Sequence, residues 1–137
     1  MSYAGDVQSR DAYAALQADE AAVLVDVRTS AEWSYVGVPD LRQIGKRVIP
    51  VEWQRFPDGA LNESFLEQLR AAGVAEGAPI YFLCRSGARS AAAAELATRA
   101  GLGPAYNVAD GFEGPLDAEG HRSVAGWKVD GLPWRQG

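Results

Sequence analysis

The stretch IYFLCRSGARS, at residues 80–90, is the part of the sequence that decides the fold. Its first four residues are apolar and partly aromatic, a pattern typical of a buried strand. Residues 90–100 contain Ala, Glu, Leu and Arg without Pro or Gly, which predicts a helix that ends before Gly101. We therefore expect a strand, a short loop and a helix, with Cys84 at the point where the strand ends.

The loop that follows Cys84 is expected to bind an anion. The first amides of a helix have no partner inside the helix, and successive loop amides can form a concave anion site. A thiolate at Cys84 would be stabilised by these amides and by the charges of Arg85 and Arg89, which makes it a nucleophile near neutral pH. The competing interpretation is an inert cysteine buried as a small apolar residue. The adjoining loop and arginines favour the reactive thiol.

The length and composition of the chain predict one globular domain over residues 1–137. A chain of 137 residues can bury a substantial core but is too short for two ordinary domains. Its 47% hydrophobic and 23% charged residues are usual for a soluble protein. The first residues lack the order of a secretory signal, and no apolar run is long enough to span a bilayer. These features predict a cytoplasmic protein that does not bind membranes.

Charge and cysteine content argue against several classes of function. A net charge of -5 and a pI near 4.8 disfavour a nucleic-acid or anionic-membrane surface, which needs basic faces. Cys84 is the only cysteine in the sequence, so it forms neither an internal disulfide nor a thiolate metal cluster. The only histidine, His121, cannot make a metal site alone. We therefore expect no bound metal.

Strand and helix patterns alternate along the rest of the chain. This alternation predicts an α/β fold with a central parallel sheet flanked by helices on both faces. Ligands of such sheets bind beyond the C-terminal ends of the strands, where Cys84 and Arg28 both fall. Helices are predicted at residues 9–18, 29–35, 63–72 and 90–100, and strands at residues 22–27, 47–51, 79–83 and 106–108.

The end of the strand at residues 22–27 carries charged residues with structural roles. Arg28 could contact the Cys84 loop or form an ion pair with Asp26 that holds neighbouring loops, and the ion pair is favoured. Thr29 and Glu32 have the spacing of a capping box, in which each side chain satisfies a first-turn amide of the following helix.

The sequence suggests roles for the three polar residues Arg85, Arg89 and Ser90 of the Cys84 loop. Arg85 is expected to reach the anion pocket. Arg89 could reach it as well, or turn away and bind loop carbonyls. Ser90 could cap the following helix, bind a ligand at Cys84 through its hydroxyl, or do both.

Three motifs, in this order, resemble those of the single-domain rhodaneses, a family of sulfurtransferases. Residues 26–33 (DVRTSAEW) look like the family's early motif, and residues 84–90 (CRSGARS) look like its active-site loop. Residues 126–127 (GW) and 131–133 (GLP) resemble its C-terminal motif. Where relatives commonly carry Gly-His-Ile-Pro-Gly-Ala, this chain has Gly37-Val38-Pro39-Asp40-Leu41, so the resemblance does not extend to the loop at residues 36–45.

The resemblance implies a rhodanese-like three-layer fold and a ping-pong sulfur transfer. The Cys84 thiolate would take the outer sulfur of a small anionic donor such as thiosulfate, become a persulfide, and pass this sulfur to a thiol or protein acceptor. No metal or organic cofactor is expected to take part. The loop that would bind the sulfur and the donor comprises Arg85, Ser86, Gly87, Ala88, Arg89 and Ser90, and the residues that would support the site structurally are Asp26, Arg28 and Glu32.

Two alternative functions are less well supported by the sequence. A cysteine phosphatase or arsenate reductase needs five residues between its cysteine and arginine to surround a tetrahedral oxyanion. Only four residues separate Cys84 from Arg89, and Leu83 stands where such enzymes carry a histidine. The second alternative is a noncatalytic rhodanese-like module that binds or regulates a partner. Such modules often lose the cysteine, which this chain retains.

Overall fold

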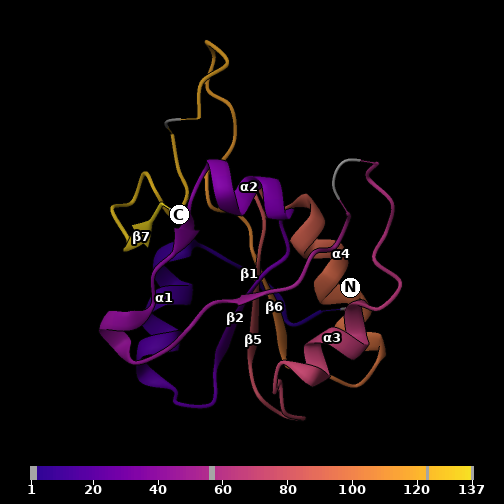
Figure 1. The fold of residues 1–137 in the computed structure, drawn as a ribbon. Coiled ribbons are helices and arrows are strands. Elements are labelled where there is room, and N and C mark those ends of the chain that lie inside the picture. Colours follow the sequence, from indigo (N-terminus) through magenta and orange to yellow (C-terminus); the bar gives the residue numbers. More distant parts are fainter. Residues whose placement is uncertain (1–2, 56–57, 123, 137) are drawn as a thin grey trace.

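A five-stranded parallel sheet forms the centre of the molecule (Figure 1). The computed structural model describes residues 3–55, 58–122 and 124–136. Every pairing between neighbouring strands of this sheet is parallel, as the alternation of strands and helices predicted. The strands lie in the order β1 (Gly5–Val7), β6 (Ala105–Val108), β5 (Ile80–Leu83), β2 (Val23–Asp26) and β4 (Ile49–Pro50).

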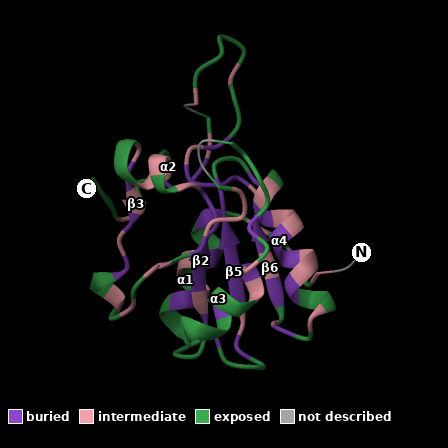
Figure 2. Ribbon diagram, turned by 45° about the vertical axis from the view of Figure 1, so that its right-hand side comes forward, coloured by how far each residue is buried: buried purple, intermediate pink, exposed green. Residues whose placement is uncertain are grey.

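Helices cover both faces of the sheet, which confirms the expected three-layer architecture. One apolar cluster joins α3 (Phe65–Ala71) and α4 (Ala88–Arg99) to one face. A second cluster joins α1 (Ser9–Ala18) and the buried Trp127 to the other face. Figure 2 shows the strands as a buried layer between these helices.

The strand β5 contributes to both apolar clusters. Ile80 and Phe82 pack with α3 and α4, whereas Tyr81 and Leu83 pack on the side of α1. Consecutive side chains of a strand point to opposite faces, and both faces of this sheet are covered. The unbroken apolar run at residues 80–83 is therefore the signature of a central strand buried on both sides.

Several boundaries differ from the sequence-based expectation. The helix α4 begins at Ala88, two residues before the predicted start, because Gly87 is its N-cap with a φ of 106°. The helix α3 begins at Phe65 instead of residue 63, with Ser64 as its N-cap. The edge strand β1 was not predicted, because three residues carry too little periodicity to be recognised. Pro50 lies in the opposite edge strand, where a residue without an amide proton is tolerated.

The loop at residues 36–45 is organised by the C-terminal tail. It contains the short strand β3 (Val38–Pro39), which pairs antiparallel with β7 (Trp134–Arg135), and a 3-10 turn, η1 (Arg42–Ile44). At Gly37, with a φ of 110°, a Cβ would come within 2.8 Å of the Trp134 ring, so only glycine fits here. The tail thus contributes a two-residue strand that the sequence did not predict.

One segment extends away from the body of the molecule. Residues 115–122 rise beyond the C-terminal edge of the sheet and are largely exposed (Figures 1 and 2). His121 lies in this segment and is exposed. Within the part of the chain that the structure describes, no helix is both long and apolar enough to cross a membrane.

Candidate active site

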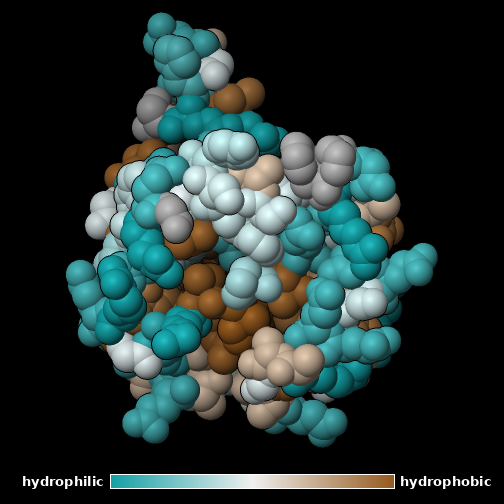
Figure 3. Space-filling model, in the orientation of Figure 1, coloured by the Kyte–Doolittle hydropathy of each residue, from teal (hydrophilic) through white to brown (hydrophobic). Residues whose placement is uncertain are grey.

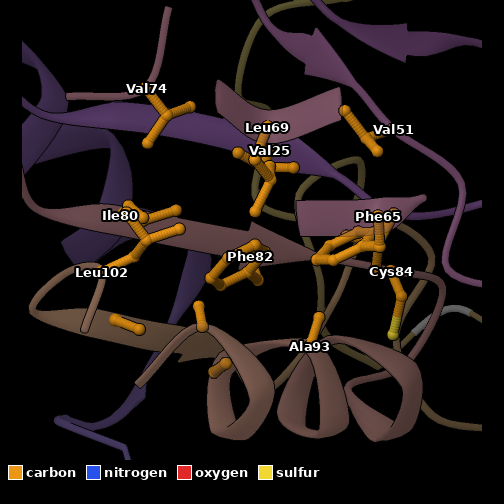
Figure 4. Packing of buried hydrophobic residues seen from close by; sticks show 14 residues of the cluster. Val25, Val51, Phe65, Leu69, Val74, Ile80, Phe82, Cys84, Ala93 and Leu102 are labelled. Atoms are coloured by element: carbon orange, nitrogen blue, oxygen red, sulfur yellow. The ribbon is translucent and has the colours of Figure 1, made fainter. Parts of the chain in front are cut away.

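Cys84 directly follows β5, at the C-terminal edge of the sheet. Its Sγ accepts a hydrogen bond of 3.1 Å from the Gly87 amide and lies 3.2 Å from the Ser90 hydroxyl. Figure 4 shows the sulfur turned toward α4. Cys84 is only 1% exposed, whereas Arg85 and Ser86 in the same loop are exposed. The sulfur therefore lies at the base of a loop whose outer residues face solvent.

A second loop, after β6, holds the Cys84 loop in place through the backbone. The Phe112 amide donates to the Cys84 carbonyl at 2.8 Å, and the Gly114 amide donates to the Arg85 carbonyl at 3.0 Å. The approach is so close that a Cβ on Gly111 would overlap the Arg85 backbone, and one on Gly87 would overlap the Ala109 carbonyl. The second loop thus binds two carbonyls of the Cys84 loop.

The start of α4 lies beside the sulfur, which contacts the Gly87 amide and the Ser90 hydroxyl. One interpretation of the sequence made Ser90 the N-cap of this helix. This is wrong, because Gly87 is the N-cap. The Ser90 hydroxyl instead contacts the Cys84 sulfur and donates to Asn107 Oδ1 at 2.5 Å. First-turn amides of a helix lack partners within the helix, and the helix dipole adds positive potential. The sulfur therefore lies in a site suited to an anion.

The Arg89 side chain forms an ion pair with Glu32. Its guanidinium donates to both carboxylate oxygens of Glu32, at 2.7 and 3.0 Å. The two side chains are 20% and 18% exposed. Glu32 also completes the predicted capping box with Thr29 at the start of α2 (Ser30–Tyr35). The ion pair therefore fixes α4 to α2, and Arg89 supplies positive potential to the site from this fixed position.

Burial and hydrogen bonding act in opposite directions on Glu32. Burial raises the pKa of a carboxyl group, but hydrogen bonds from Arg89 and from the Thr29 backbone favour the charged form. The hydrogen bonds prevail, and the pKa of Glu32 falls to about 2. Glu32 therefore carries its charge throughout the physiological pH range.

We expect Glu32→Gln to lower the free energy of unfolding by about 1–2 kcal/mol at neutral pH, a value reduced for solvent screening. A carboxyl group with a depressed folded pKa stabilises the protein above its unfolded pKa and loses this effect as the pH falls through the folded pKa. The difference from the parent protein should therefore be full above about pH 5 and fade toward about pH 2. Urea unfolding at several pH values measures it, with the exposed Glu63→Gln as control. A difference independent of pH would contradict the assignment.

Arg28 and Asp26 form a buried ion pair beside the site. Arg28 is fully buried, and its Nη2 donates to Asp26 Oδ2 at 2.7 Å and to the Gly37 carbonyl at 2.8 Å. The guanidinium lies 4.3 Å from the centre of the Phe112 ring. This geometry supports the structural role that the sequence favoured: Arg28 joins the loop before β3 to the loop after β6.

Arg85 is the arginine that remains available to a ligand. Its side chain is exposed, and among the described residues it has no ion-pair partner. The sequence did not identify Asn107, which binds the Ser90 hydroxyl, or Gly111 and Phe112, which support the Cys84 loop. A polar residue in the apolar strand at 106–108 was the only available signal for Asn107.

A separate cavity lies beside this site. It encloses about 530 Å³ at the C-terminal ends of β2 and β4, and Cys84 is not among its lining residues. The residues that line this cavity include Asp26, Trp33, Val38, Pro39, Asp40, Leu41, Arg42, Lys46, Arg47, Val48, Pro50 and Arg135.

The described residues contain no cluster of three His, Cys, Asp or Glu side chains that could hold a metal ion.

The fold is that of a rhodanese-like domain. The polysulfide-sulfur transferase homodimer of Wolinella succinogenes has the same fold, with a TM-score of 0.67 and 23% identity over 96% of this chain and 78% of that one. At this identity the likeness concerns the fold alone.

The chain belongs to the STR4 middle domain family, whose model matches residues 4–137. The crystal structure of Rv0390 from M. tuberculosis superimposes with a TM-score of 0.91 and 57% identity, covering 99% of this chain and all of that one. An uncharacterized Rickettsia conorii protein is 40% identical over 95% of this chain and 96% of its own length. Rhodanese-like domain-containing protein 4 of Arabidopsis thaliana chloroplasts is 30% identical, but the match covers only 25% of that protein.

Proposed function

We propose that this protein is a sulfurtransferase that carries a sulfane sulfur as a persulfide on Cys84. The observation that carries the proposal is the position of the Cys84 sulfur, which accepts the Gly87 amide and faces the first turn of α4. A thiolate and a persulfide anion are both stabilised by such amides. Two plant chloroplast relatives are named rhodanese-like, which agrees with a domain of this kind.

The reaction consists of two balanced displacements. In the first, the thiolate attacks the outer sulfur of thiosulfate, a new S–S bond forms, and sulfite leaves with the electron pair of the broken S–S bond. In the second, a thiophilic acceptor attacks the outer sulfur of the persulfide and regenerates the thiolate. The charge resides on sulfur or on the departing sulfite in every state, so a site of fixed amides serves both steps.

The two arginines of the loop have different parts in this proposal. Arg85 is exposed and unpaired among the described residues, so it can attract the doubly charged donor. Arg89 is held by Glu32 and acts only through its electrostatic potential. The Glu32 pair also disfavours phosphatase activity, because it occupies the arginine at the end of the loop that would clamp the oxyanion.

Steady-state kinetics test this proposal. Rates of thiocyanate formation, measured over varied thiosulfate and cyanide concentrations, should give parallel double-reciprocal lines, because the two substrates react in separate half-reactions. Intersecting lines would contradict a persulfide intermediate. Folded protein without turnover from thiosulfate or polysulfide would instead favour the noncatalytic module.

A further inference from the structure

We propose that Asn107 is a positioning residue that controls the direction of the Ser90 hydroxyl and thereby the protonation of Cys84. The three groups form a buried chain: Asn107 accepts from Ser90 at 2.5 Å, and Ser90 lies 3.2 Å from the sulfur. Ser90 is fully buried and Asn107 is 4% exposed. The role of this chain in turnover rests on the proposed function, but its effect on the thiol does not.

Asp6 fixes the orientation of the Asn107 amide. The Asn107 amide nitrogen donates to Asp6 Oδ1 at 3.0 Å, and a carboxylate can only accept. Tyr3 donates to the same oxygen at 2.8 Å. The Asn107 oxygen must therefore face Ser90. A hydroxyl has a single proton, and Ser90 gives it to this oxygen.

This arrangement has opposite effects on the two forms of Cys84. Toward the sulfur, Ser90 presents only a lone pair, which accepts a proton from a thiol but repels a thiolate. When the thiol ionises, the hydroxyl can turn to the sulfur, but the buried Asn107 oxygen then loses its donor. Asn107 thus competes with the sulfur for the Ser90 proton and stabilises the resting thiol. The Gly87 amide donates to the sulfur in either state.

The same competition favours persulfide formation. In the persulfide, the negative charge lies on the outer sulfur, so the inner sulfur no longer needs the Ser90 proton. The hydroxyl can then return to Asn107 and restore the hydrogen bond of 2.5 Å. No proton is transferred in this change; only the direction of one hydrogen bond alters.

Other charged groups also contribute to the environment of Cys84. Arg89 is the cation on α4 whose charge interacts with Cys84, and it is neutralised in part by Glu32. The other charged residues on or next to these elements are Asp6 on β1, Asp26 at the end of β2, Arg28 after β2, Arg85 in the loop, Glu95 and Arg99 on α4, and Asp110 and Glu113 after β6.

Alkylation of Cys84 by iodoacetamide tests the proposal without requiring sulfur transfer. In Asn107→Leu the Ser90 proton is free to bind the sulfur, so alkylation at pH 7 should be about fivefold faster and its pH profile should shift to lower pH. In a Ser90→Ala background the same substitution should produce no acceleration. Intact-protein mass spectrometry measures the rates. Slower alkylation, or equal acceleration in both backgrounds, would overturn the proposal.

A pair of substitutions at the exposed Asp6 avoids changing the core. In Asp6→Ala the Asn107 amide can turn its nitrogen to Ser90, which frees the hydroxyl proton for the sulfur and accelerates alkylation. Asp6→Asn removes the same charge but keeps an acceptor for Asn107, so the rate should stay close to that of the parent protein. Equal acceleration in both variants would reduce the effect to charge alone and contradict the proposal.

Discussion

Arg28→Met is expected to lower the free energy of unfolding by about 3–5 kcal/mol. The substitution leaves the Asp26 carboxylate, 1% exposed, without its cation. It also removes the hydrogen bond to the Gly37 carbonyl and the contact with the Phe112 ring. Urea unfolding followed by circular dichroism at neutral pH measures the change.

Two further variants show whether the unpaired charge is the cause. Arg42→Met breaks an exposed ion pair with Asp40 and should change the stability by less than about 1 kcal/mol. Combining Arg28→Met with Asp26→Leu removes both buried charges and should recover much of the lost stability. A loss below about 1 kcal/mol for Arg28→Met alone would contradict the structural role of this pair.

Cys84→Ser is expected to abolish thiocyanate formation from thiosulfate and cyanide. A serine hydroxyl does not ionise near neutral pH and forms no persulfide, so turnover should fall at least about 1,000-fold. The fold should be kept, because oxygen and sulfur differ little in size and both can accept the Gly87 amide.

The exposed Ser34→Ala in α2 is a suitable control and should retain the parent rate. Residual turnover by Cys84→Ser near the parent level would contradict the nucleophile assignment. A cellular test separates the two candidate functions. If Cys84→Ser abolishes sulfur transfer but leaves the cellular phenotype unchanged, the catalytic account fails and a noncatalytic role is favoured.

The central layers of the fold could be predicted from the sequence because the apolar pattern within each segment indicates the type of element and the residues that it buries. The boundaries of α1 were predicted correctly, and β2 and β5 lie within their predicted runs. The strands β1 and β7 were missed because each has only two or three residues and exists through pairing with a distant segment. Propensity cannot identify such strands, since their stability comes from the partner.

The candidate site also contains a part that the sequence predicted and a part that it did not. The Cys84 loop was predicted because its residues are contiguous. The Arg89 pair with Glu32 joins residues 57 positions apart, and the Ser90 bond to Asn107 joins residues 17 positions apart. These contacts depend on how α4 sits against α2 and β6, which no local pattern encodes. The sequence left open that Arg89 binds the anion directly. Because of the ion pair with Glu32, Arg89 instead acts as a fixed positive charge near the site.

The most direct test of the account is the mass of the protein after treatment with thiosulfate in the absence of reducing agents. We expect the addition of one sulfur atom, located on Cys84 by peptide mapping, absent from Cys84→Ser and removed by cyanide as thiocyanate. An unchanged mass in folded protein, or a sulfur atom attached at another position, would contradict the claim that Cys84 carries the transferred sulfur.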